Sequence, residues 1–313
     1  MTSPLVDPMG ASVDSNIKRA NLSSLQSELA SLLVSGDLVL LLGAGASAGV
    51  GLPSWDDLAT GVASRCGVET RAPMQANQLL SLCRLRCDED TSKGNAVFLA
   101  HVRDTLYENV RSDDGFSNTL LVERLLIAIG AIVMSSMRGS TIDIYTLNLD
   151  DVLDWYLHLH GFRTQIVTDM PSPLHGNVDA RILHLHGFLP LQGMYSASRW
   201  TVLTEDEYVG RLAESGSTGW SNLFLSALQT KRVLVIGTSF HDTDIQVLFQ
   251  KTVGDSGRHC GYAMIVPSSD TDENTLAANR LKQAGLKPIN LPSHAEYPEF
   301  LLGVCRRAAI AEG

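Results

Sequence analysis

Residues 39–49, VLLLGAGASAG, run from an apolar stretch of strand length into a turn made almost wholly of glycine, alanine and serine. Large side chains are missing where a phosphate would have to touch the backbone. Gly43 and Gly45 can take positive φ and can let a ligand approach the main chain closely. The helix that follows can then direct its free N–H groups and the positive end of its dipole at a pyrophosphate. The stretch therefore predicts a nucleotide site near the N-terminus.

The composition is that of an ordinary globular protein. The chain has 313 residues, 44% hydrophobic and 19% charged, so its length allows one large domain or two ordinary ones. The formal net charge is −10. Because non-specific binding to nucleic acid needs clustered lysine and arginine, this acidic balance favours no direct nucleic-acid partner.

Cysteine usage bears on metal binding and on the compartment. The five cysteines are Cys66, Cys83, Cys87, Cys260 and Cys305. An odd number without paired CxxC spacing argues against a disulfide framework and against a four-cysteine zinc ribbon. Cys83 and Cys87 lie four residues apart in a helical-looking segment, and we interpret them as small packing residues. A reduced, cytoplasmic compartment fits this usage, and we expect no metal site.

No segment is typical of secretion or of membrane insertion. The opening residues, MTSPLVDPMGASVDSN, lack a basic start followed by an apolar core, so they do not form a secretory signal. We expect residues 1–20 to be a flexible lead-in. The most apolar window, residues 125–134, has about half the length that a membrane-spanning helix needs, and we interpret it as part of a buried helix.

Short apolar strands alternate with helices along the chain. We expect strands over 38–42, 142–147, 182–185, 201–203, 232–236, 262–266 and 287–291. We expect helices over 21–35, 75–85, 96–110, 118–137, 150–160, 217–230, 242–254 and 272–284, and others that start near residues 54, 204 and 296. The alternation predicts an α/β fold with a Rossmann-like, doubly wound, mostly parallel sheet. The segment of about 75–138 shows no convincing strand and is expected to be a helical insertion.

Polar residues follow four of the predicted strands, where ligands bind in open parallel sheets. These four places are the glycine turn at 43–49, the stretch TLNLD at 146–150, the stretch HLHG at 184–187 and the stretch GTS at 237–239, with Asp242 and Asp244 close behind. Each has an ordinary structural alternative when taken alone: a tight connection, a helix cap, a structural histidine or a simple turn. Their order and common location suggest one cleft.

The order of these motifs resembles the Sir2 (sirtuin) superfamily. The first family signature, a GAGxS…GIPxF-type loop, corresponds to GAGASAGVGLPSW at 43–55. The second, T-x-N-x-D, corresponds to residues 146–150, the third to His186-Gly187, and the fourth, a glycine-serine turn after a late strand, to residues 237–239. The resemblance spans roughly residues 36–300. It implies one NAD-binding catalytic domain over 21–313 that includes the helical insertion.

The departures from the family pattern point to one branch. Deacylating sirtuins usually carry a four-cysteine zinc module, but no cysteine occurs between Gly187 and Arg232, and Ser54-Trp55-Asp56 stands where Phe-Arg often follows the loop proline. The stretches TVLTEDEY at 201–208 and GTSFHDTDI at 237–245 resemble the zinc-free, SIR2-like bacterial branch. Members of that branch act as NAD+-hydrolysing effectors in anti-phage defence. The resemblance thus implies NAD+ as substrate, no zinc, a homo-oligomer, and a separate sensor protein such as an ATPase or a short Argonaute-type partner.

On this resemblance, cleavage of the nicotinamide–ribose bond gains from groups that stabilise an oxocarbenium-like sugar and position the nucleophile. His186 is the candidate general base, Asn148 would position the ribose or the water, and Asp150 would hold the nicotinamide amide or stabilise positive charge. Candidate NAD+-binding residues are Gly43, Ala44, Gly45, Ser47 and Pro53 in the first loop, and Gly237, Thr238, Ser239 and Asp244 near the last. We expect His184 to pack beneath His186.

Three alternatives remain open. A Sir2 deacylase would transfer the acyl group of a lysine to ADP-ribose, and the absent zinc cysteines count against it. A dehydrogenase would fit the relaxed fingerprint Gly43-x-Gly45-x-x-Ala48, but that fold needs a strand with an acidic end about 20 residues on, where this chain turns helical. A non-catalytic NAD or ADP-ribose sensor is the third, and the intact Asn148 and His186 argue against it.

Overall fold

The computed structural model describes residues 8–69, 74–90, 93–110, 114–136, 141–169, 172–191, 195–198, 200–214, 219–238, 240, 242–254 and 259–310. Within this part of the chain, no helix is long and apolar enough to cross a membrane.

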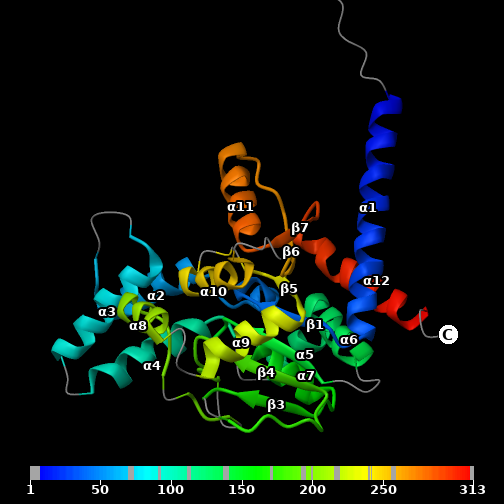
Figure 1. Cartoon of the computed structure of the whole chain (residues 1–313). Helices are drawn as coiled ribbons and strands as arrows, with labels where there is room; N and C mark the ends of the chain where they lie inside the picture. Colours follow the sequence, from blue (N-terminus) through cyan, green and yellow to red (C-terminus); the bar gives the residue numbers. More distant parts are fainter. Residues whose placement is uncertain are drawn as a thin grey trace, which may run out of the picture.

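One seven-stranded parallel sheet forms the centre of the molecule (Figure 1). Its strands are β1 (Leu38–Leu42), β2 (Ile142–Thr146), β3 (Thr164–Val167), β4 (Ala180–His184), β5 (Arg232–Ile236), β6 (Gly261–Ile265) and β7 (Leu286–Asn290). They lie in the order β3-β4-β2-β1-β5-β6-β7. The chain crosses from β4 to β5 past β2 and β1, which places a topological switch beside β1. The predicted Rossmann-like α/β fold is confirmed.

Helices cover both faces of this sheet (Figure 1). Those before β2 are α1 (Pro8–Val34), α2 (Trp55–Cys66), α3 (Ala76–Asp90), α4 (Gly94–Leu106), α5 (Asp114–Val122) and α6 (Arg124–Ser136). Those after β2 are α7 (Val152–Leu159), α8 (Glu205–Glu214), α9 (Gly219–Thr230), α10 (Thr243–Val253), α11 (Thr271–Gln283) and α12 (Tyr297–Ile310).

The central strand β1 contributes side chains to two buried clusters. Leu38, Leu40 and Leu42 pack into a cluster with residues of α1 to α4, α6, α7 and α12. Val39 and Leu41 point the other way, into a cluster with α9, α10 and α11. Successive side chains of a strand face opposite sides of the sheet, so a strand covered on both faces must be apolar throughout. This explains the unbroken apolar run at residues 38–42.

Four boundaries differ from the sequence expectation. Strand β3 was not predicted, because its residues Thr164–Val167 lie at the sheet edge and three of the four are only half-buried. Residues 201–203 form no strand, and only an isolated antiparallel bridge joins Thr201 to Gly187. The single helix expected over 118–137 is two, α5 and α6, because the Glu123 carboxylate accepts the first N–H groups of α6. Helix α1 begins at Pro8, earlier than the expected helix over 21–35.

The chain after β1 does not enter a helix directly, and the next helix begins where the sequence predicts it, near residue 54. Two short 3₁₀ turns follow, η1 (Ala44–Ala46) and η2 (Ala48–Val50). Helix α2 begins only at Trp55, where the Ser54 hydroxyl accepts the Asp57 N–H at 3.2 Å. The positive end of the α2 dipole therefore does not lie directly behind the glycine turn, and exposed backbone of the 3₁₀ turns takes its place.

The glycines of the first turn are explained by close packing rather than by positive φ. Gly43 has φ −121, and a Cβ there would lie 2.6 Å from the Cβ of Thr238. A Cβ on Gly45 would lie 2.9 Å from the Cα of Gly237. Gly237 does have positive φ, +72, and a Cβ on it would lie 2.6 Å from the Ala46 nitrogen. The turns after β1 and β5 thus touch backbone to backbone.

We predict that Gly237→Ala lowers the free energy of unfolding by about 3 kcal/mol, the sum of left-handed backbone strain and forced overpacking. Gly67→Ala is the matched control, because Gly67 also has positive φ, +63, yet has no atom within 4 Å of the added Cβ. This control should cost only about 1 kcal/mol. Urea unfolding of both variants measures the difference, and equal losses would show that turn packing contributes nothing.

Candidate functional site

Hydrogen bonds join the four motifs at the carboxyl ends of the adjacent strands β4, β2, β1 and β5. The Gly45 N–H donates to the Gly237 carbonyl at 2.8 Å, which links the first motif to the fourth. Ser47 bonds to residues of the second motif, and His184 of the third bonds to the carbonyl of Asn148 in the second. The structure therefore brings together the motifs that the sequence placed far apart.

Ser47 connects the glycine turn to the loop after β2. The Asn148 side-chain amide donates to the Ser47 hydroxyl at 3.1 Å, and that hydroxyl donates to Asp150 Oδ1 at 3.0 Å. Asp150 Oδ1 also accepts the Val152 N–H at 3.1 Å, at the start of α7. Asn148 is half-buried, so part of the residue is open to solvent while its side-chain amide is bonded to Ser47. Ser47 and Asp150 thereby fix the orientation of that side chain.

Asp150 lies inside the protein. Burial raises the pKa of Asp150 to about 6, although the hydrogen bonds from the Val152 N–H and the Ser47 hydroxyl oppose this rise. The carboxylate Oδ1 is used by internal partners. This geometry favours a positioning role for Asp150 over the direct contact with nicotinamide expected from the sequence.

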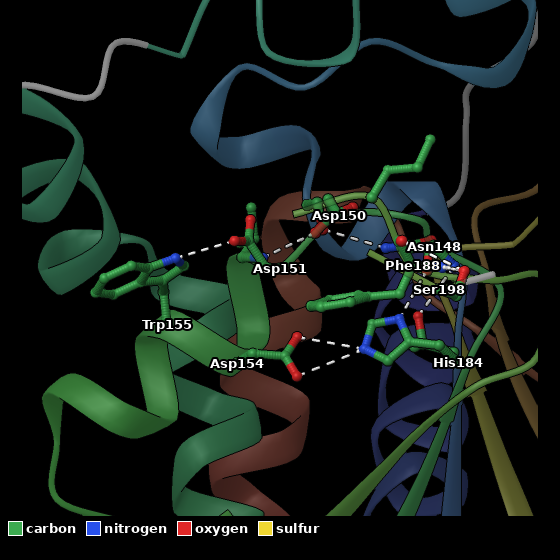
Figure 2. A network of polar contacts seen from close by, with 12 residues as sticks. Asn148, Asp150, Asp151, Asp154, Trp155, His184, Phe188 and Ser198 are labelled. Carbon is green, nitrogen blue, oxygen red and sulfur yellow. Dashed lines mark hydrogen bonds and ion pairs between the residues drawn. The ribbon is translucent and has the colours of Figure 1, made fainter. Parts of the chain in front are cut away.

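His184 lies beneath the Asn148 loop, as expected for the packing histidine of the pair (Figure 2). Its Nδ1–H donates to the Asn148 carbonyl at 3.1 Å, and its Nε2 lies 3.4 Å from Asp154 Oδ2. The Phe188 ring packs against the imidazole with centroids 4.4 Å apart. Burial lowers the pKa of His184, but the attraction and hydrogen bonds of Asp154 and the Asn148 carbonyl outweigh it and raise the pKa.

A cavity of about 10 Å³ lies beneath Asn148. It is lined by Leu42, Ala46, Ser47, Leu126, Thr146, Asn148, Asp150, Leu153, Asp154, Ile182 and His184. That volume has the size of about one water molecule. The cavity is therefore too small for a nucleotide. On the neighbouring turns, Ala44 and Gly45 are exposed and Asn148, Gly237 and Thr238 are half-buried.

Asp151 forms a second buried anchor that sequence reasoning missed (Figure 2). The Tyr107 hydroxyl donates to its Oδ1 at 2.8 Å, and the Trp155 indole N–H and the Leu191 N–H donate to its Oδ2 at 3.0 and 3.1 Å. Burial raises the pKa of Asp151 in spite of these hydrogen bonds. Since Tyr107 follows α4, Asp151 ties the helical insertion to the loop after β2. The adjacent pair Asp150-Asp151 was the available sequence signal.

His186 pairs with Asp244 across the site. Its Nε2 lies 3.0 Å from Asp244 Oδ2, and both side chains are buried. Burial opposes ionisation of Asp244, but the charge and hydrogen bond of His186 outweigh it and lower the pKa of Asp244. An ionised carboxylate only accepts, so Nε2 carries the proton in this hydrogen bond. Asp244 is thus a hydrogen-bond partner of His186, and its predicted contact with the ribose stays a prediction.

Tyr208 extends this pair toward α8. Its ring meets the His186 imidazole edge-on with centroids 5.4 Å apart, and its hydroxyl donates to Asp242 Oδ1 at 3.2 Å. Ligand atoms of His186, Asp242 and Asp244 lie within 4.8 Å of one another, a spacing that could hold a cation. The hydrogen bonds to Asp242 and Asp244 already account for this spacing.

Two of the predicted site residues remain to be placed, Ser239 and Pro53. Ser239 lies outside the described residues, and Pro53 is half-buried between η2 and α2. Beside Ser239, Phe240 has φ +58, the single positive value among non-glycine residues in the part of the chain described. Its N–H donates to Thr238 Oγ1 at 3.0 Å. Backbone strain of this kind clusters at functional sites, so the turn after β5 is a candidate ligand contact.

We predict that Asp150→Asn stabilises the chain more at pH 7.5 than at pH 5. The pKa of Asp150 is raised on folding, so the wild type carries stability below about pH 4 that is lost as the pH rises through about 6. Asparagine does not titrate. The advantage of the variant should grow by about 1 kcal/mol over this interval, measured by urea unfolding at both pH values. A difference that does not change with pH would contradict the assignment of a buried, titrating carboxyl.

Comparison with known proteins bears on one part of the chain. Residues 143–289 match the model of a protein family described as the SIR2-like domain. No curated protein matches the chain. The matched residues include Asn148, His186, Gly237 and Asp244, whereas β1 and the glycine turn precede them and pair with β2 and β5 in the same sheet. The chain thus carries a SIR2-like domain over residues 143–289, which implies NAD-related activity.

Proposed function

We propose that the chain is an NAD+ glycohydrolase that cleaves the nicotinamide–ribose bond to release nicotinamide and ADP-ribose, the latter linear or cyclic. The observation that carries the proposal is the buried His186–Asp244 pair. It lies at the carboxyl end of the sheet, as Asn148 does, and within a SIR2-like domain. We further propose that one catalytic unit spans residues 21–313, because β1 completes the sheet of the matched domain.

The pyrophosphate would bind across the turns after β1 and β5. Ala44 and Gly45 expose their backbone there, and Gly237 and Thr238 are half-exposed. Small residues on both turns let phosphate oxygens approach the backbone closely, although the Gly45 N–H is already donated to the Gly237 carbonyl. The topological switch beside β1 is where dinucleotides bind in such sheets. Ser47 is buried and acts by orienting Asn148.

The chemistry needs a base, a positioning group and stabilisation of a positively charged sugar. His186 would take the proton from the attacking water or from a ribose hydroxyl as the nicotinamide leaves. Asp244 would hold the Nε2–H and stabilise the imidazolium that forms, as the carboxylate of a catalytic triad does. Asn148 would orient the ribose or the water. With water as nucleophile, NAD+ and water give nicotinamide, ADP-ribose and a proton.

The biological setting follows from the resemblance to the zinc-free bacterial branch. We propose an effector of anti-phage defence that acts by abortive infection, draining NAD+ from an infected cell. An effector of this kind must be inactive until it is triggered. We propose a separate sensor protein, such as an ATPase or a short Argonaute-type protein, and self-association of the chain as the means of activation.

We predict that the purified chain releases nicotinamide from NAD+, with a rate per chain that rises with protein concentration. Asn148→Ala and His186→Ala should each lower the rate by at least about 100-fold, the usual contribution of a general base. His158→Ala is the control, because it removes an exposed imidazole of α7, and it should keep full activity. Nicotinamide release is followed by chromatography, with and without an acetylated peptide.

The outcomes separate the alternatives. Release that requires the acetylated peptide would indicate a deacylase. Binding of NAD+ without release at any concentration, together with unchanged cellular NAD+ in phage-infected bacteria that express the chain, would indicate a sensor. Undiminished release by both active-site variants would show that the site is wrongly assigned.

We predict a distinct effect for Asp244→Asn, which keeps the shape but removes the charge beside His186. The rate should fall by about 10-fold or more, while KM for NAD+ changes little, because Asp244 acts through His186 and not on the ligand. The acidic limb of the pH–rate profile should move to lower pH, since a neighbouring carboxylate favours the protonated imidazole. An unchanged profile with a raised KM would instead place Asp244 on the ribose.

A further inference from the structure

Three helices of the insertion bring thiols and an imidazole together. Cys66 is the last residue of α2, Cys87 lies on α3 and His101 on α4. The two sulfur atoms are 3.7 Å apart, and the ligand atoms of all three residues lie within 4.8 Å of one another. None of these residues belongs to the proposed NAD+ site.

The spacing and the donor types agree with one kind of ion. Two thiolates bound at about 2.3 Å to a tetrahedral zinc lie about 3.8 Å apart, close to the observed sulfur–sulfur distance. Thiolate and imidazole donors select zinc-class ions, whereas magnesium and calcium prefer oxygen. Cys87 is buried, while Cys66 and His101 are half-buried, so an ion could enter from solvent.

A fourth donor lies nearby. Cys83 is fully buried one turn before Cys87 on α3. Residues four apart on a helix share a face. We propose that Cys66, Cys87 and His101 bind a zinc-class divalent ion, with Cys83 or water in the fourth position. This departs from our sequence expectation of no metal and of Cys83 and Cys87 as packing residues.

Such an ion would join α2, α3 and α4, which also pack together through apolar side chains. Helix α3 in turn contacts α8, where Arg84 pairs with Glu207 at 2.6 Å and the Glu205 N–H donates to the Ser81 hydroxyl at 2.9 Å. Figure 1 shows α2, α3, α4 and α8 grouped at one end of the molecule. Since α8 carries Tyr208 against His186, the ion would stiffen the surroundings of the base.

The test measures metal directly. The full chain, purified without metal-affinity chromatography, should contain about one zinc per chain by elemental analysis. After chelation, the chain should take up one Co2+ and show the absorption of tetrahedral thiolate coordination, and Zn2+ should raise its Tm. Cys66→Ser and Cys87→Ser should each lose metal and the Tm shift, whereas Cys305→Ser, a buried cysteine on α12, should keep both.

His101→Ala is the variant that should keep its fold, because this half-buried residue can be removed with little effect on the core. It should weaken zinc binding by at least about 10-fold with the far-UV circular dichroism unchanged, and Cys83→Ser decides whether the fourth ligand is a thiol or water. Failure of the wild type to bind Zn2+ or Co2+, a Cys66–Cys87 disulfide in the freshly isolated chain, or full zinc retention in Cys66→Ser and Cys87→Ser would each overturn the proposal. No readout uses NAD+, so the result is independent of the proposed reaction.

Discussion

The backbone contact between Gly45 and Gly237 fixes the distance between the two turns that form the proposed phosphate site. The Gly45 N–H donates to the Gly237 carbonyl at 2.8 Å, and neither residue has room for a Cβ. β1 and β5 are neighbouring strands at the topological switch, so this contact holds together the turns at their carboxyl ends. The proposed site lies at this end of the sheet. Ser47, two residues on, then reaches Asn148 and Asp150, so the same turn also orients the β2 loop.

The site is built in two layers. The outer layer consists of exposed or half-buried groups, among them Ala44, Gly45 and Asn148. The inner layer consists of buried polar groups that hold the outer one in place, such as His184 with Asp154 (Figure 2), and Asp151 with Tyr107. Buried polar networks of this kind are costly unless satisfied, and when satisfied they rigidify a site. This arrangement suits a reaction in which the base and the ribose must be held at fixed positions relative to each other.

The sequence was sufficient for the fold wherever a strand was buried on both faces. Residues 38–42 and 233–236 are unbroken apolar runs, and they lie in the central strands β1 and β5. The edge strand β3 was missed because half-buried residues carry no such signal. The break at Glu123 was missed because a side chain, not glycine or proline, ends one helix and caps the next.

The motifs of the site were visible in the sequence, but their partners were not. Local spacing predicted that polar residues after four strands would converge, since parallel strands end at one edge. The pairing of His186 with Asp244 joins residues 58 positions apart, and Tyr107 and Asp151 are 44 apart. The cluster of Cys66, Cys87 and His101 comes from three helices and has no short motif. Such contacts depend on how the helices pack, which periodicity does not determine.

The most direct test of the central claim is a structure of the chain bound to a non-hydrolysable NAD+ analogue. We expect the pyrophosphate against the backbone of residues 44–45 and 237–238, with the nicotinamide ribose within hydrogen-bonding reach of Asn148 and close to His186. An analogue bound elsewhere, or one with its adenine end at His186, would contradict this expectation.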